Sequence, residues 1–275
     1  MNYQKIASLL RNLADEIENT KEDATIETNI FDHNGRFIPQ GVKSAVYESN
    51  KKFYLKQPDI DFTLRFDAIK KLNVKPLTSS SFKKQSTSLI EKLQANPNTR
   101  NLLNGVCLPI VLPKLDIKDY GATIEDLLLS VEKSYKAEYP SRTFINYRKN
   151  ELQGKVSIID PSHEALIEKL REAPQVGLYL PTALQGFSVL AQREQVLPEG
   201  FSLCGLEIII AQIMYPDILA RDFYTPGFDL AALQWQGARS SLYFEALDAW
   251  LEFDRRFLDA RGAYSGGLFV LGSGI

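Results

Sequence analysis

Cysteine, histidine, methionine and tryptophan are scarce, with two of each in 275 residues. Cys107 and Cys204 both stand among apolar neighbours, which is typical of buried, inert thiols in a reducing compartment. There is no C-x-x-C or H-x-x-x-H spacing from which to build a zinc site. We therefore expect no structural disulfide, no metal and no cofactor, and a cytoplasmic location.

Long hydrophobic runs are also missing. The densest one, residues 206–215, is interrupted by Glu207 and Gln212 and falls well short of the roughly 20 residues that cross a bilayer. The first residues alternate charged and apolar side chains, unlike a secretory signal, so the mature chain is expected to begin here. The sequence predicts a soluble protein with no membrane partner.

The common catalytic and phosphate-binding motifs do not occur. There is no Gly-x-Ser-x-Gly elbow, and neither cysteine belongs to a Cys/His signature, which disfavours serine and cysteine hydrolases. The glycine pairs at 266–267 and 272–274 have no helix after them whose amides could face a phosphate.

The two histidines give weak functional signals. His33 lies between Asp32 and Asn34 in an expected turn, where a solvated side chain is the favoured interpretation. His163 could be a general base beside Glu164. We favour a surface residue in the first turn of a helix, where the helix dipole would keep the imidazole neutral. It is no zincin fragment, because Ile167 replaces the second histidine of H-E-x-x-H.

The overall composition is that of a folded protein, with 44% hydrophobic and 24% charged residues. Residues 1–100 carry 16 Lys and Arg against 12 Asp and Glu, whereas residues 101–275 carry 16 against 22. A boundary near residues 96–99 follows from this shift. We expect a basic helix-plus-hairpins unit over 1–100 and a larger mixed α/β body, rich in aromatic loops, over 101–275.

The patterns predict an α+β fold that begins with a helix and a small antiparallel sheet. Apolar residues recur with helical period over residues 2–18. Alternating segments follow at residues 26–30 and around Phe37, joined by Asn34-Gly35, a pair typical of tight hairpin turns. Residues 44–47 are expected to pair with 53–55, and residues 62–66 to form another strand.

The remaining elements form the expected α/β body. Helices are predicted over 80–95, after Gly121 with a capping signal at Thr123, and from Asp160-Pro161 to Pro174. Strands are predicted at 106–112, which Pro109 and Pro113 confine to a sheet edge or a bulge, and at 176–180 and 268–271. Two segments stay open: 206–215 favours a helix over a strand, and 242–253 fits either a helix or a hairpin.

The basic segment 43–92 interleaves cations with aromatic residues. Lys51, Lys52 and Lys56 stand beside tyrosine and phenylalanine, a composition that suits single-stranded nucleic acid. Lysines on edge strands also prevent sheets from pairing with each other, and the chain as a whole is slightly acidic. Nucleic-acid binding is therefore only a third hypothesis.

Candidate binding residues concentrate between positions 191 and 235. Arginine, carboxylate and aromatic side chains occur there in loops bounded by proline and glycine, as is typical of ligand or partner sites. The candidates are Arg193, Glu194, Asp217, Arg221, Asp222, Tyr224 and Trp235. The alternative is a structural loop in which Arg221 pairs with Asp222 or Asp217 and the aromatic residues fill the core.

Three functions remain open on these observations. The leading hypothesis is an interaction or accessory protein that binds a protein or a small ligand through the C-terminal loops. The runner-up is an enzyme that uses Asp217, Asp222 or Glu194 for acid/base chemistry, with Arg193 or Arg221 holding an anionic substrate. A deep pocket with a carboxylate of raised pKa would favour the enzyme, and a flat aromatic patch would favour the binding protein.

Overall fold

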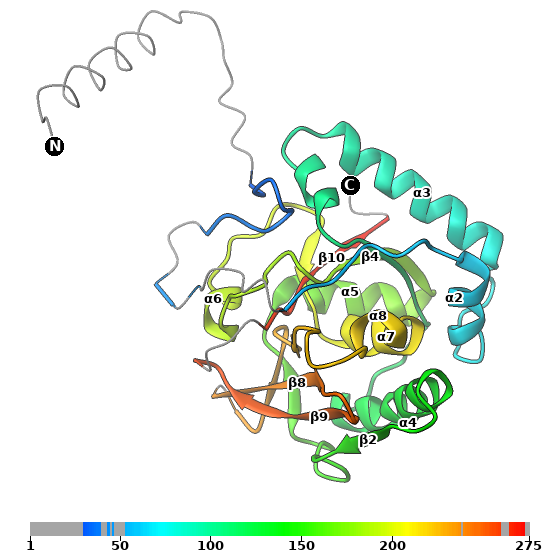
Figure 1. Cartoon of the computed structure of the whole chain (residues 1–275), viewed down its shortest axis with the longest axis vertical. Coiled ribbons are helices and arrows are strands. Elements are labelled where there is room, and N and C mark those ends of the chain that lie inside the picture. Colours follow the sequence, from blue (N-terminus) through cyan, green and yellow to red (C-terminus); the bar gives the residue numbers. More distant parts are fainter. Residues whose placement is uncertain are drawn as a thin grey trace, which may run out of the picture.

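The structure is a computed structural model that describes residues 30–39, 43–44, 46, 53–237, 239–259 and 264–272. The predicted helix at 2–18 and most of the strand at 26–30 lie outside these residues. The described part contains seven α-helices, a short 3-10 helix and three sheets (Figure 1). The predicted α+β class is confirmed.

The helices are α2 (Phe62–Ile69), α3 (Ser79–Ala95), the 3-10 helix η1 (Arg100–Asn104), α4 (Tyr120–Glu138), α5 (Pro161–Glu172), α6 (Val189–Arg193), α7 (Leu206–Met214) and α8 (Pro216–Leu219). The strands are β1 (Leu108–Leu112), β2 (Thr143–Asn146), β3 (Val156–Ile158), β4 (Gln175–Leu180), β5 (Phe201–Leu203), β6 (Phe228–Asp229), β7 (Leu233–Trp235), β8 (Ser240–Ala246), β9 (Trp250–Phe257) and β10 (Leu268–Leu271).

The central sheet has the antiparallel order β1-β4-β10-β5 and is covered on both faces. Leu178 and Val270 belong to the apolar cluster that includes residues of α3, whereas Tyr179 and Phe269 belong to the cluster that includes α7. This division follows from the alternation of side chains along a strand. The strand β1, which contains Pro109, lies at the sheet edge, which is one of the two positions predicted for it.

The second sheet has the order β2-β9-β8-β6 and settles the open segment 242–253. The segment belongs to the hairpin of β8 and β9, which turns around Asp248. Leu242 and Phe244 are buried while Tyr243 and Glu245 are half-buried, so one face of the hairpin is apolar and the other polar. β3 and β7 form a separate pair.

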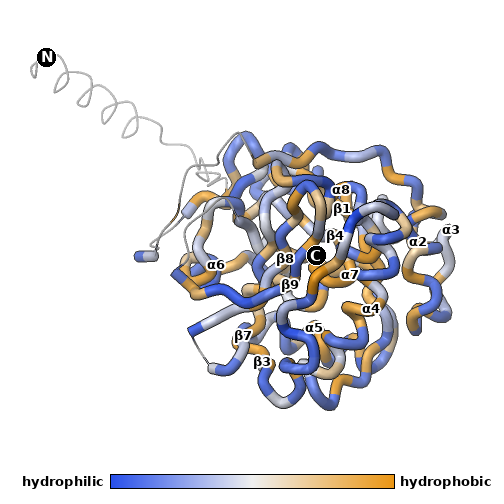
Figure 2. Tube along the Cα trace, turned by 60° about the horizontal axis from the view of Figure 1, so that its bottom comes forward, coloured by the Kyte–Doolittle hydropathy of each residue, from blue (hydrophilic) through white to orange (hydrophobic). Residues whose placement is uncertain are grey.

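Helix α7 is buried on every side, which explains why its sequence pattern was ambiguous. All residues of Leu206–Met214 are buried, and the helix contacts α2, α4 and β1. A helix surrounded by protein needs no polar stripe, so periodicity alone cannot separate it from a central strand. The favoured helix is confirmed. In Figure 2 apolar stretches run through the region of α7, β1 and β4.

The predicted strand at residues 62–66 was wrong. Residues 62–66 form the start of α2, because Asp61 caps the backbone N–H groups of Thr63 and Leu64. Phe62 and Phe66, four residues apart, face the same ring of Phe82 in α3. That spacing fits one face of a helix as well as one face of a strand.

The expected pairing of residues 44–47 with 53–55 was also wrong where the structure describes it. Val46 forms an isolated bridge with Phe187 instead. Helix α4 begins one turn earlier than expected, because Asp119 rather than Thr123 accepts the capping hydrogen bond. The start of α5 at Asp160-Pro161, the helix over 80–95 and the strands at 176–180 and 268–271 are confirmed.

Helices α2 and α3 pack against the rest of the protein. α2 contacts α7 and β1, and α3 contacts β4. The division into units 1–100 and 101–275 stays a prediction. No helix in the described residues is both long enough and apolar enough to cross a bilayer.

Candidate functional site

Four aromatic side chains from two distant segments meet at the surface. We call Phe53, Tyr54, Phe223 and Tyr224 the aromatic patch. The ring centroids of Phe53 and Phe223, and of Phe223 and Tyr224, are 5.8 Å apart. The N–H of Tyr54 donates to the carbonyl of Tyr224 at 3.0 Å, which joins the two segments. Tyr54 and Tyr224 are 46% and 47% exposed, so their rings are accessible.

Arg221 and Asp222 hold the patch in place. The Arg221 Nε lies 2.8 Å from Asp222 Oδ2, and the guanidinium carbon lies 5.2 Å from the ring centroid of Tyr54. Asp222 Oδ1 accepts the N–H of Tyr224 at 2.9 Å, and Thr225 N–H donates to the Asp222 carbonyl. The loop is thus a turn organised by its own aspartate. The side chains of Arg221 and Asp222 are 31% and 29% exposed.

A cavity of about 440 Å³ adjoins the patch. Its volume lies within the range of small-molecule sites. Phe53, Tyr54 and Leu55 form one side, and most of the other lining residues are polar. The lining is completed by Asp32, Asn34, Arg36, Gln57, Asn104, Gly105, Val106, Thr182 and Gln185.

Side-chain amides fix the walls of this cavity. The amide of Gln57 donates to the carbonyl of Cys107 at 3.0 Å and accepts its N–H at 2.7 Å, as a neighbouring strand would. Gln185 donates to the carbonyl of Phe53 at 2.9 Å. These bonds tie the segment that carries two patch residues to the central sheet.

The far wall is the predicted Asn-Gly turn, which is confirmed. Asp32 Oδ1 accepts the N–H groups of Asn34 and Arg36, at 2.8 and 2.9 Å. Gly35 has a φ of 76°, a conformation in which a side chain is disfavoured. His33 is exposed, as expected.

Asp217 lies elsewhere and forms a clamp. Both of its oxygens accept from Arg65, at 2.6 and 2.7 Å, and Arg65 also donates to the carbonyl of Met214. The Arg65 guanidinium carbon is 4.4 Å from the ring centroid of Tyr215. The alternative in which Arg221 pairs with Asp217 is wrong. This pair fastens α2 to α8.

Arg193 and Glu194 also have structural partners. Arg193 donates to the carbonyls of Ala231 and Leu233, at 2.9 and 2.7 Å, and burial lowers its pKa to about 10. Glu194 is exposed and accepts the hydroxyl of Ser44 at 2.6 Å and its N–H at 3.0 Å. Hydrogen bonds to Ser44 lower the pKa of the Glu194 carboxyl.

Trp235 is 5% exposed and lies near two guanidinium groups, with ring-centroid distances of 5.5 Å to Arg148 and 5.6 Å to Arg255. Among the candidates in the binding region, the structure brings together only Arg221, Asp222 and Tyr224. Lys51 and Lys52 lie outside the described residues, and Lys56 is exposed.

The expected surface position of His163 was wrong. His163 and Glu207 are both 0% exposed, and His163 Nδ1 lies 3.2 Å from Glu207 Oε1. Burial opposes the charged imidazolium, but the attraction and hydrogen bond of Glu207 outweigh it and raise the pKa of His163. The helix dipole and Glu207 therefore act in opposite directions on the charge of His163.

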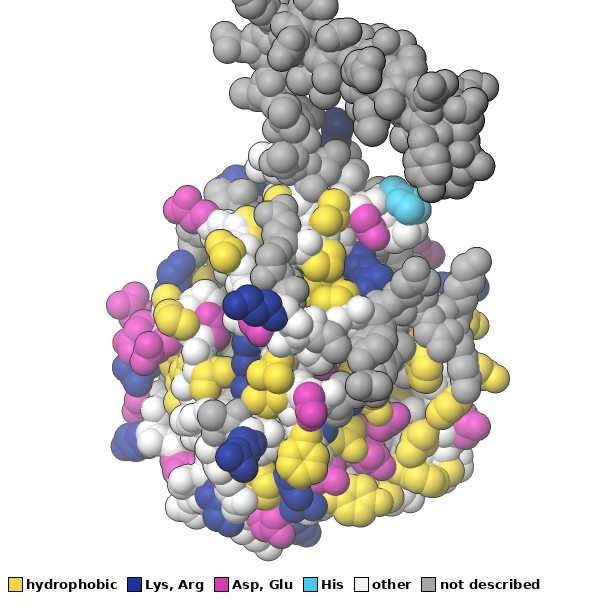
Figure 3. Space-filling model, turned by 90° about the vertical axis from the view of Figure 1, so that its left-hand side faces the viewer, with side chains coloured by type: hydrophobic (Ala, Val, Ile, Leu, Met, Phe, Trp, Pro, Cys, Tyr) yellow, Lys and Arg dark blue, Asp and Glu magenta, His cyan; other side chains and the backbone are white. Residues whose placement is uncertain are grey.

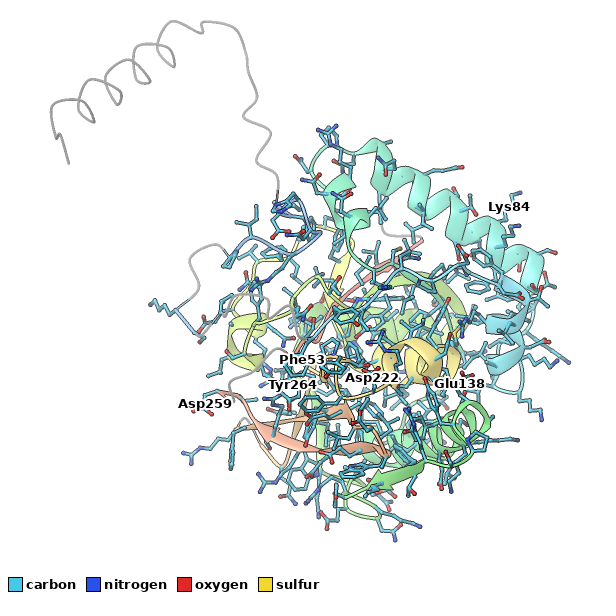
Figure 4. The ribbon with its side chains drawn as sticks, viewed as in Figure 1. Phe53, Lys84, Glu138, Asp222, Asp259 and Tyr264 are labelled. Carbon is cyan, nitrogen blue, oxygen red and sulfur yellow. The ribbon has the colours of Figure 1, made fainter. Side chains whose placement is uncertain are left out.

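The polar face of the second sheet was not anticipated. Buried Asp229 lies 3.3 Å from Arg256, whose guanidinium carbon is 3.5 Å from the ring centroid of Tyr264. The Tyr264 hydroxyl donates to Glu245 at 2.8 Å. Burial raises the pKa values of Asp229 and Glu245. The alternation through Tyr243 and Glu245 could have revealed a polar face, but not its partners. In the projection of Figure 4, the labelled Tyr264 appears in the same part of the picture as Phe53 and Asp222.

No group of three or more His, Cys, Asp or Glu side chains in the described residues is arranged to hold a metal ion. Comparison with protein-family models, curated proteins and solved structures gives no match. The functional argument therefore depends on the geometry of this chain.

Proposed function

We propose that this chain is a cytoplasmic, non-enzymatic binding protein whose protein partner docks on the aromatic patch. The observation that carries the proposal is the preorganised pair of exposed rings, Tyr54 and Tyr224, joined by a backbone hydrogen bond and flanked by Arg221. Tyrosine and arginine dominate the energetics of protein interfaces. Rings held in place before binding lose little entropy when a partner arrives.

The surroundings of the patch support this choice over the runner-up. Asp217, Asp222 and Glu194, the carboxylates nominated for catalysis, already accept hydrogen bonds from arginine or backbone groups. The cavity beside the patch could receive one side chain of the partner. On the face shown in Figure 3, hydrophobic side chains are interspersed with charged ones.

Photo-crosslinking in the source cells tests the proposal. A benzophenone amino acid replaces Tyr224 in one full-length variant and Leu64 in the control, because Leu64 is 59% exposed on α2 and does not belong to the patch. We expect one discrete protein adduct from position 224 and none from position 64. Adding Tyr54→Ala should lower the yield from position 224 about tenfold, in line with the loss of a hot-spot residue.

The proposal fails if position 224 gives no adduct, or if positions 224 and 64 give the same set. It also fails if Tyr54→Ala leaves the yield unchanged while the variant remains folded by circular dichroism.

A further inference from the structure

A second surface lies between the edge strand β2 and helix α4. Within the described residues, β2 is a terminal strand of its sheet and pairs only with β9, in parallel. Figure 1 shows β2 at the lower edge of the protein with α4 beside it. A groove of about 360 Å³ separates the two elements, and we call it the β2–α4 groove.

Along its outer edge β2 has no partner strand in the part of the chain that the structure describes. The N–H of Thr143 donates to the carbonyl of Ala249, just before β9, at 3.1 Å, and the N–H of Tyr147 donates to the carbonyl of Phe253 in β9 at 3.0 Å. In a parallel pair alternate residues bond the same neighbour. Phe144 and Asn146 therefore direct their N–H and C=O groups away from β9. An edge of this kind is a template for another strand.

The groove beside this edge has an apolar floor and an acidic wall. Phe144 packs against the main core from the strand side, and Leu129 on α4 is 65% exposed. Three acidic residues of α4 also line the groove: Glu125, Asp126 and Glu132. Among the described residues of the lining, the one cationic residue is Lys149, in the loop after β2. Carboxylates thus outnumber cations among the lining residues, although Glu132 is paired with a lysine on its own helix.

We propose that the β2–α4 groove binds an extended segment of another protein with alternating apolar and basic residues, which adds to the sheet as a strand beside β2. The backbone groups of Phe144 and Asn146 would supply the hydrogen bonds. Because side chains alternate between the two faces of an added strand, the basic set would face the groove, with its aliphatic stems over Phe144 and Leu129 and its charges near the acidic wall. The apolar set would lie on the other face of the sheet. Strand addition combines main-chain affinity with specificity from alternate side chains in this way. The inference is independent of the aromatic patch.

The probe is the blocked peptide acetyl-KVKVKVK-amide, tested on the full chain by fluorescence anisotropy and amide hydrogen exchange. We expect saturable binding, slower exchange of the Phe144 and Asn146 amides, and no binding of the EVEVEVE peptide. Two further peptides carry N-methyl groups on all valines or on all lysines. Because only alternate residues of an added strand donate to β2, one of these peptides should lose binding and the other should keep it.

Charge reversal tests the acidic wall. Asp126→Lys with Glu132→Lys should weaken the lysine peptide about five- to tenfold, as expected for exposed charges. The matched control is Asp67→Lys on α2, which should leave the affinity unchanged. Strand addition is refuted if both methylated peptides bind like the parent, or if the protected amides lie outside β2. Equal affinity for the lysine and glutamate peptides, or an unaltered affinity in the folded double variant, refutes the basic specificity.

Discussion

Replacing Glu207 by glutamine removes the carboxylate that faces His163 inside the protein and keeps the size of the side chain. Both residues are fully buried, and the second carboxylate oxygen accepts the N–H of Gly205 at 2.8 Å. Asp160, at the start of the helix that carries His163, also raises the pKa of this histidine. Glu207→Gln should therefore remove most of the support for the imidazolium.

The sign of the pH dependence follows from the raised pKa of His163. The folded protein keeps its proton to a higher pH than the unfolded chain, whose histidine has a pKa of about 6.5. The His163–Glu207 pair contributes its full stabilisation at pH values below the pKa of the unfolded chain. This contribution is lost as pH rises through the pKa of His163 in the folded protein. Within this window stability falls by about 1.4 kcal/mol per pH unit.

Urea denaturation between pH 5.5 and 8.5 measures this contribution. Glu207→Gln should destabilise the protein by about 3 kcal/mol at the acidic end, as expected for a broken buried pair, and by less at the basic end. The control is Glu164→Gln, an exposed residue of α5, which should follow the wild type within about 0.5 kcal/mol. A loss for Glu207→Gln that does not change with pH would show that His163 is neutral and refute the reasoning.

Three further outcomes are expected. In urea denaturation, Arg65→Ala should lower the unfolding free energy by about 3 kcal/mol, because it leaves Asp217 without its bidentate partner. The control Lys70→Ala, which breaks an exposed ion pair, should lower it by less than about 1 kcal/mol. Equal losses would contradict the clamp. Gly121→Ala should lower the unfolding free energy by at least about 2 kcal/mol, since its Cβ would lie 1.9 Å from a backbone oxygen, and an unchanged free energy would disprove this close approach. Cys107 and Cys204 should resist iodoacetamide at pH 8 until urea unfolds the chain, because burial raises the pKa of both thiols, that of Cys107 to about 12. Rapid labelling of the native protein would argue against their burial.

Signals confined to a few residues made several elements predictable. Asp160 and Pro161 define the start of α5 by themselves, and Pro109 restricts β1 to an edge or a bulge wherever the sheet forms. The Asn-Gly pair at Gly35 needs no distant partner either. The structure of residues 62–66 was predicted wrongly because the short segment fits both the helical and the strand period. The cap at Asp61 and the packing on α3 decide in favour of the helix.

Contacts between residues far apart in the sequence could not be predicted. The burial of His163 depends on Glu207 from another helix, which no local pattern reveals. Arg221 and Asp222 are neighbours in one loop, so their pairing could be anticipated. Tyr54 joins them only because the chain returns from a segment far away in the sequence. Of the four residues of the aromatic patch, Tyr224 alone was among the predicted binding residues.

The most direct test of the aromatic patch as a docking surface is the effect of Arg221→Ala on the adduct formed from position 224, with His163→Ala as the comparison. Because Arg221 is partly exposed, its loss should cost less than about 1 kcal/mol of stability while lowering the adduct yield at least about fivefold. His163→Ala should lower the thermal midpoint and leave the yield per folded molecule unchanged. The account is contradicted if Arg221→Ala retains the full yield, or if His163→Ala causes the larger loss of binding.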